Sequence, residues 1–180
     1  MSRRRDAPLS GTSDPAVRAA EGDHGGVSAA HPTAPPATPA GEHEPAACPG
    51  CGAVLAPAPG STGPEGAAAA CARLFEETTR GLREESPSDP RAAATVALAD
   101  TAYAAQHPDP ADPTAVHAAL DTLVRRLGDD PNPDPSPQRP HSWQMTPADI
   151  AADLDVVGVE VLVESYARTV AEDWSRATRS

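Results

Sequence analysis

The concentrated chemistry of this sequence lies in its three cysteines. Residues 48 to 52 read Cys-Pro-Gly-Cys-Gly, and Cys71 is the third cysteine. Two thiolates on a tight Pro-Gly turn supply half of a tetrahedral metal site, for which Zn²⁺ is the usual occupant. Gly52 can adopt a backbone conformation that a residue with a Cβ resists, which lets nearby N–H groups point at the sulfurs. We therefore predict a knuckle-like turn with Cys48 and Cys51 as metal ligands.

Cys71 and a histidine are the candidates for the other two ligands, because the sequence has no second Cys-x-x-Cys pair. His107, at the end of a predicted helix, and His117, beside an apolar stripe, rank almost equally as the fourth ligand. His43 ranks third, because the prolines around the knuckle forbid a helix there. The prediction is one Zn²⁺ ion. The competing interpretation is two free thiols at the knuckle and Cys71 as an ordinary core residue.

Two polar residues precede His107 on the same predicted helix. Asp100 and Gln106 share the face that leads to His107, so either could hold the second ring nitrogen of a metal-bound histidine. Gln106 is otherwise expected to be solvated. We assign no catalytic residue and no binding site for an organic cofactor.

Composition divides the chain into a leader and a domain. Residues 1–45 are rich in Pro, Gly, Ser, Thr and Ala, and cannot bury enough apolar surface to offset the entropy of ordering. We predict a disordered leader over 1–45 and a helical metal-binding domain over 46–177. The domain has few aromatic residues, so its core is expected to be thin and to gain from a metal clip.

The net charge of −12 limits the partners of this protein. So acidic a chain repels phosphate backbones, which argues against nucleic-acid binding and favours basic or neutral partners. Three arginines follow Met1, but the apolar core of a signal peptide does not follow them, and a run of about 18 apolar residues is absent from the sequence. We therefore expect no membrane partner and a cytoplasmic location, with an unknown protein as a possible partner.

Hydrophobic periodicity predicts a mainly α fold, a small bundle of four to five helices. The predicted helices cover 65–84, 90–106, 113–127, 146–154 and 157–177. Asp89 and Asp112, each followed by Pro, are predicted N-caps, and Gly128 a stop. The last segment has alternating valines typical of a strand, but its later residues keep helical spacing. Short connections between the first three helices imply antiparallel neighbours, which would bring Cys71 near the two histidines.

The order of these features resembles a bacterial protein family of unknown function. The matching pieces are Cys48 to Gly52, the lone Cys71 in a helix, and the segment from Asp100 to Pro108, which resembles the family's Asp-Ala-Tyr-Ala-x-Gln-His-Pro. His117 with Leu120, Trp143 with Thr146, and Tyr166 to Trp174 follow in the family's order. The resemblance covers about residues 46 to 176 and implies the same fold and site, but no activity.

The chain departs from that family at aromatic positions. Ala72 stands where the family has a Trp after the lone Cys, and Tyr166 and Ala171 replace Trp residues of the last helix. One extra residue separates Asp100 from Ala102. A pocket walled by those rings would therefore be altered, while the fold would persist.

Three functions are compatible with these observations. The first is a zinc-stabilised helical domain that serves as a protein-interaction or regulatory module. The second is a metal-dependent, hydrolase-like enzyme in which zinc activates a water, with Asp100 or Glu76 as general base. The third is a thiol redox switch, in which Cys48 and Cys51 form a disulfide and release the metal.

Overall fold

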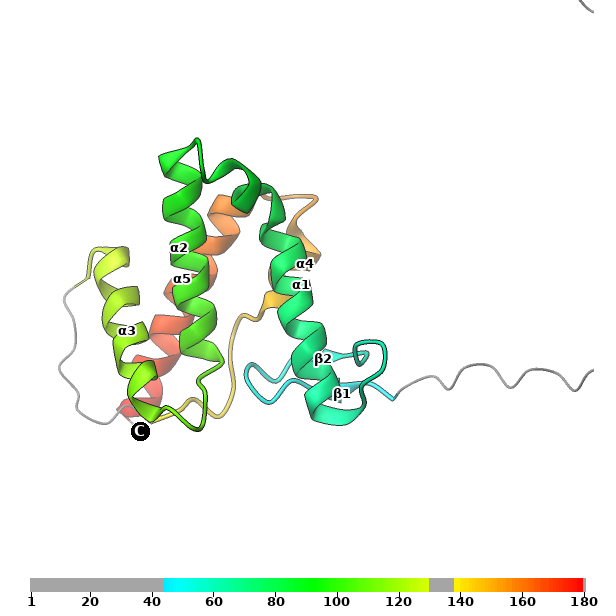
Figure 1. The fold of residues 1–180 in the computed structure, drawn as a ribbon. Helices are drawn as coiled ribbons and strands as arrows, with labels where there is room; N and C mark the ends of the chain where they lie inside the picture. Colours follow the sequence, from blue (N-terminus) through cyan, green and yellow to red (C-terminus); the bar gives the residue numbers. More distant parts are fainter. Residues whose placement is uncertain (1–43, 130–137, 180) are drawn as a thin grey trace, which may run out of the picture. The chain divides into compact units, whose positions relative to one another are not determined.

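The computed structural model describes residues 44–129 and 138–179, which belong to one compact unit (Figure 1). The predicted leader over 1–45 lies outside the described residues except for its last two positions. His43 and residues 130–137 lie outside them as well.

The described residues contain five helices and one short hairpin. This content confirms the predicted mainly α fold. The helices are α1 (Gly63–Glu85), α2 (Pro90–Gln106), α3 (Pro113–Leu127), α4 (Pro147–Asp153) and α5 (Val159–Thr178). The hairpin consists of β1 (Ala46–Ala47) and β2 (Val54–Leu55). Sequence patterns predicted all five helices but not the two strands, which are too short to leave a period.

The helix ends follow the predicted capping residues. The carboxylate of Asp89 accepts from the N–H of Arg91, and that of Asp112 accepts from two N–H groups of α3. Gly128 ends α3 with a φ of 83°, in the left-handed region that favours glycine. Two aspartate side chains therefore fix where α2 and α3 begin, and the backbone of a glycine fixes where α3 ends.

The segment with alternating valines is a helix, as predicted. Leu162, Tyr166, Val170 and Trp174 are buried on one stripe of α5, whereas Val161 is 61% exposed. Helical spacing therefore decides which valines face the core, and the apparent alternation has no structural consequence.

The centre of the bundle is α2, which packs against α1, α3 and α5. The hairpin packs against α1, and α4 packs against α1 and α5. The main apolar cluster joins α2 to α5 with α3 and α4, and its fully buried large side chains are Leu123, Ile150 and Tyr166. A second cluster forms around Phe75, Leu82 and Val163. The third consists of Cys48, Cys51 and Cys71 alone, with partly buried neighbours.

Each helix in the described part of the chain is too short or too polar to cross a bilayer.

Candidate metal centre

The hairpin holds Cys48 and Cys51 in a closed turn. Strands β1 and β2 pair antiparallel, and two further bonds continue the pairing, from Cys48 N to Ala53 O (2.9 Å) and from Gly52 N to Cys48 O (2.8 Å). Gly52 has a φ of 78°, which a residue with a Cβ would adopt only with strain. The predicted knuckle is therefore present at the tip of a hairpin.

Backbone N–H groups of the knuckle point at the sulfurs, as expected from the sequence. The N–H of Cys51 donates to Sγ of Cys48, and the N–H of Ala53 donates to Sγ of Cys51. Such bonds stabilise the thiolate form of a cysteine, which is the form that binds a metal.

Cys71 and His107 approach the knuckle from two different helices. Cys71 lies in α1 and is fully buried, and His107 is the residue at which α2 ends. Sγ of Cys71 lies 3.7 Å from Sγ of Cys51 and 3.5 Å from Nε2 of His107. The donor atoms of all four residues, Cys48 included, lie within 4.8 Å of one another.

The two shortest spacings fit the edges of a zinc tetrahedron. With Zn–S near 2.3 Å and Zn–N near 2.0 Å, an S···S edge is about 3.8 Å and an S···N edge about 3.5 Å. The observed 3.7 Å and 3.5 Å agree with both values. A disulfide would require about 2.05 Å between sulfurs, so the cysteines are free thiols at ligand spacing. The four residues could bind a metal ion.

The three sulfurs are so close that their protonation is coupled. Thiol donation from Cys51 and Cys71 lowers the pKa of Cys48 well below its usual range. The hydrogen bond between the thiols of Cys51 and Cys48, together with burial, raises the pKa of Cys51 to about 11. Hydrogen bonds to the other two sulfurs, with burial, also raise the pKa of Cys71. A divalent cation would have to displace these protons, so its affinity would fall as the pH falls.

The ring of His107 is oriented by the last turn of α2. Its Nδ1 lies 3.0 Å from the carbonyl oxygen of Tyr103, so Nδ1–H donates a hydrogen bond to that oxygen. The lone pair of Nε2 then remains free and points toward the sulfurs. The ring also stacks on Tyr103, with centroids 4.0 Å apart, and Tyr103 stacks on Phe75 at 4.4 Å. This three-ring stack fixes the plane of the imidazole.

Gly50 makes the close approach of His107 possible. A Cβ on Gly50 would overlap Cδ2 of the imidazole and would lie 2.7 Å from Cγ. The glycine inside the Cys-Pro-Gly-Cys turn is therefore required by the histidine, and its conformation plays no part in the requirement.

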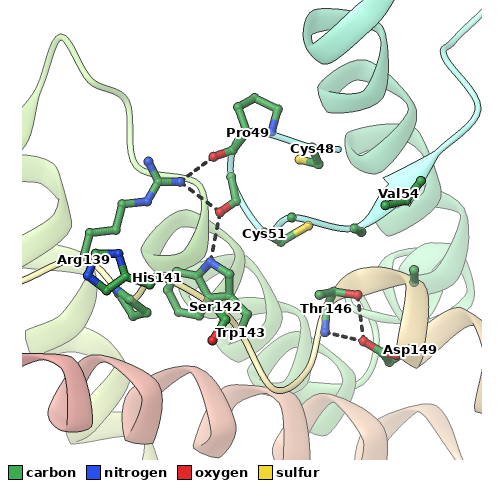
Figure 2. A pocket seen from close by; sticks show the side chains of 15 residues that line it. Cys48, Pro49, Cys51, Val54, Arg139, His141, Ser142, Trp143, Thr146 and Asp149 are labelled. Atoms are coloured by element: carbon green, nitrogen blue, oxygen red, sulfur yellow. Dashed lines mark hydrogen bonds between the residues drawn. The ribbon is translucent and has the colours of Figure 1, made fainter. Parts of the chain in front are cut away.

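A segment from the C-terminal part of the chain covers the outer side of the knuckle. Nη2 of Arg139 donates to the carbonyls of Pro49 (2.6 Å) and Gly50 (2.9 Å), and Nε1 of Trp143 donates to that of Gly50 (3.0 Å). Figure 2 shows Arg139 and Trp143 reaching the turn beside a polar cleft of about 750 Å³, whose lining includes Cys48 and Cys51. Neither contact was predicted from the sequence.

Of the five predicted ligands, the structure brings four together and leaves one apart. His117 is exposed on α3 and is not a member of the group formed by the three cysteines and His107. Both histidines were predicted near Cys71 because each lies near a connection between helices. The group forms where α2 ends against α1 and the hairpin.

Both predicted partners of the second histidine nitrogen were wrong. Asp100 pairs with Arg83, and Arg83 also contacts Glu76 at 3.2 Å. Gln106 is fully buried, not solvated: it donates to the carbonyl of Met145 and accepts from the hydroxyl of Tyr166. The backbone carbonyl of Tyr103 holds the nitrogen instead, and a carbonyl leaves no signal in a sequence.

Comparison with known proteins yields a family but no function. Residues 46–134 match a family of unknown function, DUF5946. The predicted resemblance to an uncharacterised family is thereby confirmed. The match contains all four clustered residues and ends before Arg139 and Trp143. Searches of curated proteins and of solved structures gave no significant match.

Proposed function

We propose that this protein is a zinc-stabilised helical domain that acts as a protein-interaction or regulatory module. The observation that carries the zinc assignment is the agreement of one S···S and one S···N distance with the edges of a zinc tetrahedron. Three thiolates and one imidazole are a donor set that suits Zn²⁺ better than a hard cation such as Mg²⁺.

A structural role for the metal follows from the number and origin of its ligands. Four protein donors complete a tetrahedron, so a water does not need to bind. Two donors come from the hairpin, one from α1 and one from the end of α2. One ion would therefore connect three segments whose own buried cluster contains only the three cysteines. The free energy of metal binding would then contribute directly to the stability of the folded domain.

The interaction role rests on the surface around the centre. The cleft beside the knuckle is lined by backbone and by polar side chains such as His141, Ser142 and Asp149. A surface of this kind suits a peptide segment, and the net charge of −12 favours a basic or neutral one.

Metal content tests the zinc assignment directly. The protein is purified without added zinc, and its metals are quantified by mass spectrometry. We expect about one zinc per chain. A variant in which both knuckle cysteines are serine is the matched control and should hold none. Less than about half an equivalent in the wild-type protein, with the chain folded by circular dichroism, contradicts the proposal.

A metal-dependent hydrolase is the second candidate, and the observation that favours it is that Cys48 and Cys51 line the cleft. That activity requires three protein ligands and a water open to the cleft. Cobalt substitution separates the two functions, because His107→Ala should change the cobalt spectrum only if the histidine is a ligand. An unchanged spectrum would favour the hydrolase.

A further inference from the structure

The segment that covers the knuckle acts on the sulfurs through one peptide group. The carbonyl of Gly50 accepts from both Arg139 and Trp143, and the N–H of the same peptide, on Cys51, donates to Sγ of Cys48. Donors on a carbonyl polarise the amide and make its N–H a better donor. Arg139 and Trp143 therefore both orient this peptide plane and strengthen its bond to a ligand sulfur.

Residues 138–146, which we call the brace, are anchored in the bundle independently of the sulfurs. The N–H of Gln144 donates to the buried carboxylate of Asp173 at 2.9 Å. The carbonyl of Met145 accepts from Gln106 at 2.8 Å. These two bonds fix the brace to α5 and α2, so it can hold the knuckle from a rigid base.

Ring packing extends the anchor to the core. Trp143 meets Trp174 edge to face, with centroids 6.0 Å apart, and Trp174 is 4% exposed. Nε1 of Trp174 donates to the carbonyl of Ala105. The contact between the knuckle and Trp143 therefore continues into α5 and back to α2.

Charge gives Arg139 a second effect. A Zn²⁺ ion with three thiolates and a neutral imidazole carries a net charge of −1, in a chain whose net charge is already −12. The guanidinium of Arg139 lies against the two peptide carbonyls between the knuckle cysteines. A positive charge at this place partly offsets the charge of the loaded site.

We propose that Arg139 and Trp143 are positioning residues of the metal centre, through which the brace and α5 raise its metal affinity. This inference rests on the proposed zinc site. By thermodynamic linkage, metal binding must in turn strengthen the docking of the brace by the same free energy. The C-terminal part of the chain, beyond the matched family region, thereby becomes part of the metal centre.

Zinc affinity tests the proposal, measured by competition with a chromophoric chelator. Arg139→Gln and Trp143→Phe should each bind zinc about tenfold more weakly, the lower end of the effect of groups that orient ligands. Arg125→Gln is the matched control, because it removes a charge that is also exposed, on α3, and the zinc affinity of this variant should not change. The cobalt spectrum should keep its shape in all three variants, because no ligand is lost.

The outcomes separate this proposal from the zinc assignment. A wild-type protein without bound metal contradicts the assignment itself. A wild-type protein with one zinc, and an Arg139→Gln variant of equal affinity, overturns only the role of the brace. Arg139 is exposed, so this variant should fold even if Trp143→Phe does not.

Hydrogen exchange on the wild-type chain gives an independent test of the coupling. Zinc removal should speed exchange at residues 138–146 more than at the core of α3, which does not contact the knuckle. Equal change in the two segments would overturn the coupling.

Discussion

The main apolar cluster and the knuckle are held by different forces. The apolar cluster is built from large buried side chains, among them Leu123, Ile150 and Tyr166. The knuckle cluster has three buried cysteines and little else. Burial of apolar area is non-directional, whereas ligand spacing depends on tenths of an ångström. Substitutions in the apolar cluster should therefore lower the stability of the protein in graded steps. In the knuckle, the displacement of a single atom should already change metal binding.

The largest effect is expected from removing one sulfur. Cys71→Ser keeps the size of the side chain but exchanges a soft ligand for a poor one, so zinc binding should be lost. Structural zinc contributes on the order of 10 kcal/mol to the folded state of small metal domains, so the loss should greatly destabilise the hairpin and α1. Metal analysis and thermal unfolding measure both effects. Retention of one tightly bound zinc would remove Cys71 from the site.

Truncation in the apolar cluster should lower stability without changing the metal site. Leu123 is fully buried, and Leu123→Ala should cost about 2–5 kcal/mol of unfolding free energy. Leu154, 36% exposed, is the matched position, and Leu154→Ala should cost less than about 0.5 kcal/mol. Urea denaturation measures the difference. A zinc content below that of the wild-type protein in folded Leu123→Ala would show that the two regions are not independent.

A single methyl group should show how closely the knuckle is packed against His107. Gly50→Ala places a Cβ against the imidazole of His107, so zinc affinity should fall at least tenfold. Gly81→Ala, in the open on α1, adds the same methyl group and should stabilise the protein by about 0.5–1 kcal/mol, with zinc affinity unchanged. Chelator competition and urea denaturation test the pair. Equal zinc affinity in the two variants would contradict the placement of His107.

The smallest effect is expected at the surface ion pair. Arg83 and Asp100 are 27% and 47% exposed, so Asp100→Asn should cost less than about 1 kcal/mol. Zinc affinity should not change, because Asp100 does not contact His107. A lower zinc affinity in Asp100→Asn would instead indicate that Asp100 helps to orient His107.

Sequence reasoning succeeded where the signal is local. Asp89 and Asp112 cap helices within three residues of their partners, and their positions could be predicted from the sequence. The approach of Cys71 to His107 was predictable as well, because short connections force antiparallel helices together. The choice between His107 and His117 could not be predicted from the sequence. Both histidines lie near connections between helices, and only the packing of the helices distinguishes them.

Contacts between distant residues escaped the sequence analysis. Gln106 is satisfied by Tyr166, 60 residues further along the chain, and Arg139 reaches Pro49 across 90 residues. Neither partner has a periodicity or a motif that points to the other. A buried glutamine and an arginine in a loop look like ordinary surface residues until the bundle is assembled.

The four clustered residues are spread along the chain, and this spread has a consequence for how the proposed metal centre assembles. Cys71 lies 20 residues beyond Cys51, and His107 lies 36 residues beyond Cys71. During synthesis the knuckle can capture an ion with two thiolates long before α2 exists, but only a chain made through His107 can enclose it. We therefore expect the ion to be fully enclosed only when the first two helices pair.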